Sequence, residues 1–263
     1  MKHSSRYPCY ACEGTSHEHG IWQGSEKLRT WKSIIQHNAD WLSKGKGNRT
    51  TLKHFFNCEN VPLIGTGEDE PVLFSLPPPS LHLFLSVNHI LDSLREEWPE
   101  LFDWLMSLHI VVEQYFGCTL EGNEVAKVLN NLDSLAEKLP SNLQPFVTLL
   151  KSFDEVRKSC FSAKELLPDY EEKIDLYCNA VYEVKDKFGM SITPKLHIVM
   201  EHVKTWCKKF NAPLGKFSEQ ECEAVHYQFN ALWTERFIVK DIYAPSYLDQ
   251  LLKAVLTFNE ENI

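Results

Sequence analysis

The sequence predicts a mostly α-helical protein that begins with an irregular segment. From residue 80 almost to the C-terminus, apolar residues recur at spacings of three and four positions, as they do on the buried face of a helix. Before residue 80 glycines are scattered through the chain, and only one stretch keeps the helical spacing. Three consecutive prolines at positions 77–79 form a stiff break between the two regions. We therefore expect an irregular N-terminal region followed by a helical bundle.

The composition is that of an ordinary globular protein. Of the 263 residues, 43% are hydrophobic and 24% are charged. The net charge of −9 argues against a protein whose main task is to coat nucleic acid, because phosphate binding needs a basic surface. The chain contains no run of eighteen apolar residues, so no membrane helix is predicted. The first residues lack the apolar core of a signal peptide. We expect a nuclear or cytoplasmic protein that is not secreted and has no membrane partner.

The N-terminal region contains one predicted helix, over residues 28–45, which ends at Gly45. Residues 66–70 (TGEDE) predict a loop. The apolar residues of the helix should share one side: Trp31, Ile34, Ile35, Ala39 and Leu42.

The rest of the chain predicts a series of helices. Gly189 marks the end of one of them, and Thr193 followed by Pro194 marks the start of the next, as an N-cap and a first-turn proline. This organisation suggests three regions: residues 1–79, a helical region of 80–192, and C-terminal helices of 193–263 that fold together with 1–79. The predicted helices cover residues 82–98, 100–117, 122–139, 144–161, 168–189, 194–210 and 247–259, with a further one that begins near Ser218.

The closely spaced cysteines Cys9 and Cys12 form a Cys-x-x-Cys pair. Such a turn presents two thiolates to one zinc ion and leaves two positions of the tetrahedron to fill. The pair is also compatible with two thiols that bind nothing, and a disulfide framework is not expected without a secretory signal. Candidate partners occur in three places: His17 with His19, His54 with Cys58, and His197 with His202.

His197 and His202 lie on one predicted helix, five positions apart. On a regular helix they would point about 140° apart, at about 100° per residue. They could bind one metal ion only if one of them lay at a distorted or terminal turn. The alternative is that both are ordinary surface or core histidines.

Three glutamates at the start of the helix near Ser218 raise a second question. Ser218 and Glu221 have the spacing of a capping box, and Glu219 suits the positive end of the helix dipole. Glu223 shares a face with Glu219 and with His226, so it is either a solvated flanking residue or a metal ligand. The apolar stripe of this helix should consist of Cys222, Val225, Phe229, Leu232 and Trp233.

Taken in order, several blocks resemble the catalytic core of the RAG recombinase and the related Transib transposases. The first is the Cys-x-x-Cys pair, and the second is SLHLFLSVNHILDSL at 80–94. LEGNEVAKVL at 120–129 resembles the asparagine-glycine-asparagine helix start of that family. LHIVMEHV carries His-x4-His, and LGKFSEQECEAVHYQF at 214–229 resembles the family's Ser-Glu-x-x-x-Glu-Ala helix. The blocks span nearly the whole chain.

The resemblance implies an RNase H-like domain interrupted by a large helical insertion, of which this chain would be a remnant. It also implies a structural zinc ion held by Cys9, Cys12, His197 and His202. In the family, two aspartates and a late glutamate hold two divalent cations. By position that glutamate is Glu223, immediately before the small residue Ala224, with Glu221 as the fallback.

One departure from the family changes the expected activity. The family's two catalytic aspartates precede the Cys-x-x-Cys pair, whereas the first aspartate here is Asp40. Two-metal strand transfer needs several carboxylates, so the chain is expected to be inactive alone. Mg or Mn would bind only if the missing aspartates were supplied.

The expected partners follow from the same resemblance. DNA would be bound only as part of a larger transposase, and the family implies a homodimer. No phosphate loop, Gly-x-Ser-x-Gly or HExxH motif points to another enzyme class or to a small-molecule substrate. The alternative is a domesticated, zinc-stabilised helical module that binds proteins and carries out no DNA chemistry.

Overall fold

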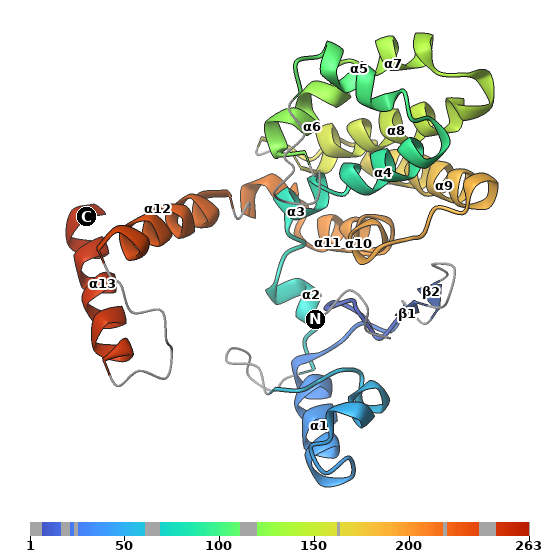
Figure 1. Ribbon diagram of the computed structural model, residues 1–263. Coiled ribbons are helices and arrows are strands. Elements are labelled where there is room, and N and C mark those ends of the chain that lie inside the picture. The colour runs from blue at the N-terminus through green and yellow to red at the C-terminus, as the bar shows by residue number, and fades with distance from the viewer. Residues whose placement is uncertain are drawn as a thin grey trace. The chain divides into compact units, whose positions relative to one another are not determined.

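The computed structural model divides the chain into two compact units, Met1–Phe217 and Ser218–Ile263. Helices make up most of both units, as the sequence predicts (Figure 1). None of the helices that the structure describes is both long and apolar enough to cross a bilayer. The structure describes residues 7–16, 22–23, 26–60, 69–110, 120–161, 164–217, 220–236 and 246–262.

The first unit contains two short strands, eleven α-helices and three 3-10 helices among the residues described. The strands are β1 (Thr15–Ser16) and β2 (Trp22–Gln23). The α-helices are α1 (Trp31–Ser43), α2 (Val72–Ser75), α3 (Ser80–Phe84), α4 (Val87–Glu97), α5 (Leu101–Ser107), α6 (Gly122–Leu129), α7 (Leu132–Lys138), α8 (Gln144–Cys160), α9 (Tyr170–Phe188), α10 (Pro194–Glu201) and α11 (Val203–Phe210). The 3-10 helices are η1 (Arg49–Phe55), η2 (Ser141–Leu143) and η3 (Leu214–Phe217).

The irregular N-terminal region is held together by short backbone ties. β1 and β2 pair antiparallel, with Ser16 opposite Trp22. The amide of Arg29 donates to the Ala11 carbonyl at 2.9 Å, and the Arg29 carbonyl accepts from the Val72 amide at 2.8 Å. This region therefore runs as an extended chain beside α2 before α1 begins.

The helix α1 confirms the predicted helix, but only part of its predicted apolar side is buried. Thr30 caps its start and accepts a hydrogen bond from the Ser33 amide. Leu42, predicted to be on the buried side, is 56% exposed. Trp31 is buried as predicted, and the helix also buries Asn38 and Trp41. Asn38 is buried because its side chain donates to the carbonyls of residues 58 and 59, a polar role that an apolar pattern cannot reveal.

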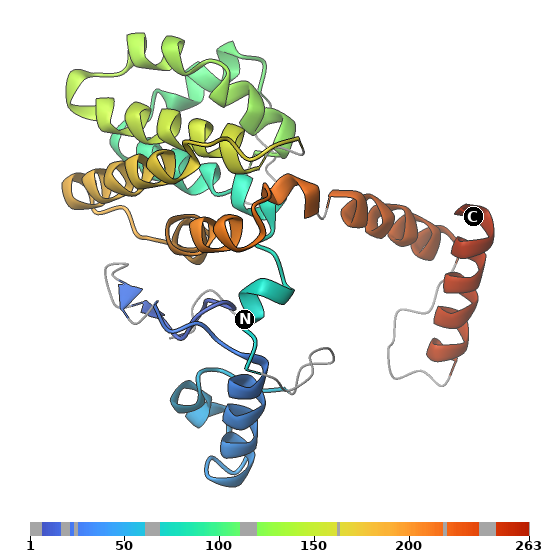
Figure 2. The same ribbon diagram turned by 180° about the vertical axis from the view of Figure 1, so that it is seen from behind.

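The helical core is built around α8 and α9, which lie side by side in both views (Figures 1 and 2). Between them are large apolar side chains without solvent exposure, among them Phe153 and Tyr177. Gly189 ends α9 in the left-handed conformation, with φ 71°, which glycine adopts without steric cost. The predicted helices over 144–161 and 168–189 are thus confirmed.

Three predicted helices are broken in the structure. The stretch 82–98 is divided between α3 and α4, and 122–139 between α6 and α7, where Asn130 and Asn131 separate the two helices. The stretch 194–210 is divided at His202 into α10 and α11. Within 100–117, α5 stops at Ser107, and the part beyond residue 110 lies outside the described residues.

The second unit consists of α12 (Gln220–Arg236) and α13 (Tyr247–Asn262). Aromatic side chains join the two helices: Phe229 meets Phe258 edge-on, and Trp233 meets Tyr247. Val225, predicted to belong to the buried stripe of α12, is 47% exposed. Among the residues that the structure describes, the aromatic contacts between the two helices begin at Phe229. Val225 lies one turn earlier on α12 and takes no part in them.

Candidate metal centre

Four side chains from the two ends of the first unit meet at one point. The ligand atoms of Cys9, Cys12, His197 and His202 all lie within 4.8 Å of one another. Each of the four side chains is at most 1% exposed. In the part of the chain that the structure describes, no other cluster of three or more Cys, His, Asp or Glu side chains is arranged to hold a metal ion.

The cysteine pair is presented by a turn of the N-terminal region. The Ala11 amide donates to Cys9 Sγ at 3.4 Å, and the Gly14 amide donates to Cys12 Sγ at 3.3 Å. Each sulfur therefore has a backbone N–H two residues further along the chain. Hydrogen bonds of this kind orient a thiolate ligand and stabilise its negative charge.

The histidine pair depends on a distortion between α10 and α11. Thr193 caps α10 through a hydrogen bond from the Leu196 amide, and His197 follows within the helix. His202 ends α10 and begins α11, with φ −113° and ψ −27°. The two imidazole rings meet edge to face, with centroids 4.9 Å apart. The condition set by the sequence, that one histidine lie at a distorted or terminal turn, is thus met by His202.

The two thiols of the cluster affect each other's pKa. A hydrogen bond with Cys12 holds the pKa of the Cys9 thiol well below its usual range, against the opposing effect of burial, and His197 and His202 lower it further. The same hydrogen bond raises the pKa of Cys12, and burial raises it as well. Burial lowers the pKa of His197. The pair thus gives up its first proton readily, and burial favours the neutral form of His197, which is the form that binds metals.

The residues fit a zinc ion. Two sulfurs and two imidazole nitrogens are a common tetrahedral zinc set, whose ligand atoms are separated by roughly 3.3–3.8 Å. Cys12 Sγ and His197 Nε2 lie 3.3 Å apart. His202 Nε2 is buried and has no hydrogen-bond partner in the structure, although burying such an atom is costly. A metal ion bound by these four atoms would satisfy it.

A buried polar network supports the cysteine turn from behind. Arg29 is 1% exposed, and its Nε donates to the carbonyl of Cys12 at 2.7 Å. Its Nη1 donates to the Phe56 carbonyl at 3.0 Å. Glu13, also buried, pairs with Lys27 and with His37. Arg29 and Glu13 could not be predicted from the sequence, because one arginine or glutamate in an irregular region carries no pattern.

Cys58 and His54 do not join the cluster. Cys58 is buried beside Arg29, whose Nη1 lies 3.5 Å from its sulfur, and His54 is exposed on η1. His17 and His19 lie outside the described residues.

Of the glutamate cluster only part is described. Glu221 and Glu223 lie in α12, but their side chains are not among those that the structure describes. Ser218 and Glu219, and with them the predicted capping box, lie outside the described residues. The assignment of Glu223 as a divalent-metal ligand therefore stays a prediction.

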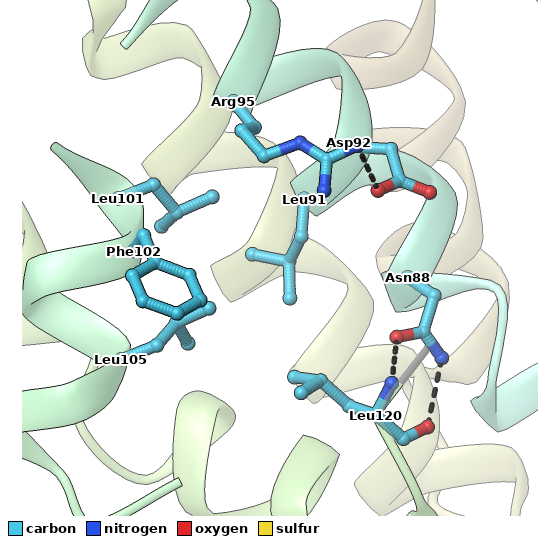
Figure 3. Close-up of a pocket in the computed structure, with 8 residues that line it drawn as sticks. All are labelled: Asn88, Leu91, Asp92, Arg95, Leu101, Phe102, Leu105 and Leu120. Carbon is cyan, nitrogen blue, oxygen red and sulfur yellow. Dashed lines mark hydrogen bonds and ion pairs between the residues drawn. The ribbon is translucent and has the colours of Figure 1, made fainter. Parts of the chain in front are cut away.

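A small hollow lies between α4 and α5 (Figure 3). Its volume is about 60 Å³, far below the roughly 300–1,000 Å³ of ordinary small-molecule sites. Burial raises the pKa of Asp92, which pairs with Arg95 at 3.3 Å. The Asn88 side chain bonds both the amide and the carbonyl of Leu120 (Figure 3), so its polar atoms serve the fold. We assign no ligand to this hollow.

Comparison of the sequence with protein-family models gave no match, and comparison with curated proteins also gave none.

Proposed function

We propose that this chain is a zinc-stabilised helical part of a DNA transposase of the RAG and Transib kind. One observation carries the proposal: the Cys-x-x-Cys and His-x4-His motifs, which the resemblance pairs at one zinc ion, form a single buried cluster. In this proposal the chain is a remnant of an RNase H-like core with its helical insertion.

The zinc ion has a structural role in this proposal. Four protein ligands close the tetrahedron, so no position remains for a substrate or a reactive water. The ion joins the N-terminal turn to the junction of α10 and α11. Because these segments are far apart in the unfolded chain, metal binding contributes directly to the free energy of folding.

Strand transfer is not proposed for the chain alone. Glu223 would be one ligand of a divalent cation, and two-metal chemistry needs several carboxylates held a few ångströms apart. Three aspartates of the first unit are engaged elsewhere in ion pairs, which supports this view. These pairs are Asp40 with Lys44, Asp69 with Lys32 and Asp92 with Arg95.

Metal analysis of the purified chain tests the zinc site. We expect one zinc ion per chain, lost when Cys9 and Cys12 are both replaced by serine. Cys178→Ser is the matched control, because that half-buried thiol contacts the Met200 carbonyl and lies outside the cluster. A zinc-free wild type would refute the site.

A DNA strand-transfer assay with Mg²⁺ or Mn²⁺ tests the expected lack of activity. We expect neither nicking nor joining by the chain alone. Glu223→Gln and Glu221→Gln form a matched pair on the same helix. Strand transfer that is lost in the first variant and kept in the second would overturn the inactive-fragment proposal.

One observation on α13 favours a second function, that of a zinc-stabilised protein-interaction module without DNA chemistry. Exposed apolar faces of helices often dock into partner proteins. A photocrosslinker at Leu252 that captures one protein reproducibly, with capture lost in Leu248→Glu, would favour this function over the transposase. The exposed aliphatic side chains of α13 are Leu248, Leu252, Val255 and Leu256.

A further inference from the structure

Trp22 lies flat against a ring of the candidate metal centre. Its indole stacks on the imidazole of His197, with ring centroids 3.7 Å apart and planes inclined by 7°. Trp22 belongs to β2, which pairs with β1 soon after the cysteine turn ends. The second strand after Cys12, β2, thus supplies the residue that covers a ligand on α10.

A hydrogen bond fixes the indole in this position. Trp22 Nε1 donates to the carbonyl of Ile192 at 2.9 Å. Ile192 immediately precedes Thr193, the N-cap of the helix that carries His197. Trp22 therefore contacts the helix start through its N–H and the ligand through its ring face.

The His197 ring is confined on three sides. Cys12 Sγ lies 3.3 Å from its Nε2, and the His202 ring meets it in a T-shaped arrangement. The Trp22 indole covers one flat side of the ring. A ring held in this way loses little freedom when a metal ion binds, because its orientation is already set. Trp22 is half-buried, whereas His197 is 1% exposed, so the indole stands between solvent and the imidazole.

We propose that Trp22 is a positioning residue of the metal centre. It holds the His197 ring with Nε2 toward the cluster and slows the release of the metal ion. This inference rests on the proposed structural zinc site. Trp22 itself is not a ligand, since an indole N–H is only a donor and here donates to Ile192.

Zinc release to an excess of chelator tests the proposal, with two variants that separate the two contacts. Trp22→Leu keeps an apolar but smaller side chain and removes both the flat ring and the N–H. Trp22→Phe keeps a flat, smaller aromatic ring and removes the N–H. We expect zinc release about 10-fold faster with leucine, which matches the lower end of the loss in metal affinity when a residue that supports a ligand is replaced, and only about threefold faster with phenylalanine.

The spectrum of the Co²⁺-loaded chain supplies a readout that a purely structural role would not move. A change in the orientation of the His197 ring changes the coordination geometry of the bound ion. The visible absorption bands of Co²⁺ should therefore shift in Trp22→Leu and stay close to wild type in Trp22→Phe. Trp41→Phe is the matched control, because the Trp41 indole also donates to a backbone carbonyl, that of Asn48, at 3.0 Å. It should leave release rate and spectrum unchanged.

The outcomes separate this inference from the function on which it rests. A wild type without zinc refutes the proposed function. A wild type that holds zinc, with Trp22→Leu showing wild-type release and a wild-type Co²⁺ spectrum, overturns the role of Trp22 alone. If the leucine variant does not fold, Trp22→Phe decides, and release as slow as in wild type overturns the proposal.

Discussion

The sulfur of Cys12 lies 3.3 Å from Nε2 of His197, although 185 positions separate the two residues. A contact between such distant positions closes most of the first unit into one loop. Closing a long loop costs conformational entropy, and a cross-link that maintains the closure stabilises the folded state against an unfolded chain that lacks it. The cluster is therefore placed where a bound metal ion would have a large effect on stability.

Removal of the metal ion should strongly destabilise the first unit. We expect Cys12→Ser, or chelation of the wild type, to lower the free energy of unfolding by about 5 kcal/mol or more. For a unit of this size that corresponds to a fall in Tm of about 10–20 °C. Calorimetry with and without added zinc measures the effect, and Cys178→Ser should keep the zinc dependence of the wild type. A Tm that ignores chelator would contradict this expectation.

Arg29→Met should weaken both the fold and zinc binding. Methionine keeps an unbranched stem but leaves the carbonyls of Cys12 and Phe56 without their donor. Buried acceptors that lose a charged donor cost about 2–3 kcal/mol. Denaturant unfolding and a competition measurement of zinc affinity check the two effects. The exposed Arg49, in which Nε pairs with Glu59, gives the control Arg49→Met, for which we expect a change below about 1 kcal/mol.

Glu13→Gln should destabilise the protein near neutral pH and lose its effect in acid. Burial alone would raise the pKa of Glu13, but hydrogen bonds from Lys27 and His37 bring it below the ordinary value of 4.5. Because the folded pKa is the lower one, the carboxylate stabilises the fold above about pH 4.5, and this contribution is lost as pH falls through the folded pKa.

We expect Glu13→Gln to lower the free energy of unfolding by about 2 kcal/mol at pH 7. The difference from the wild type should shrink below pH 4.5, as measured by urea unfolding at a series of pH values. Glu59→Gln, which removes an exposed pair, should cost less than about 1 kcal/mol. An effect of Glu13→Gln that grows toward acid pH would show that the sign is wrong.

Thr193→Ala should remove the cap of α10. The Thr193 hydroxyl accepts from the Leu196 amide at 3.4 Å, one residue before a proposed ligand. We expect a loss of about 0.5–1 kcal/mol in thermal or urea unfolding, the lower part of the range for N-caps because this bond is long. Thr148→Ala, inside exposed α8 surface, is the control and should be neutral or slightly stabilising, since alanine is the better helix former. Equal losses at both positions would contradict a capping role.

The sequence determined those features of the secondary structure, such as the ends of helices, that depend only on neighbouring residues. Gly189 ends α9, and Thr193 with Pro194 begins α10, as predicted. Such signals act through the backbone within a few residues, so they do not depend on the rest of the fold. The prediction of one continuous helix over 194–210 was wrong at His202, where the apolar spacing continues although the helix is interrupted.

For the metal centre the sequence by itself determined the donor chemistry. Cys-x-x-Cys offered two thiolates, and His-x4-His offered two imidazoles under a stated condition on helix geometry. The tertiary structure decided that these pairs meet, that His202 lies at the junction of two helices, and that Trp22 contacts His197 and Arg29 contacts Cys12. The physical reason is the distance over which each signal acts. The spacing of residues along the chain determines only the local structure that neighbouring residues form. A contact across 185 positions depends on how the whole core packs.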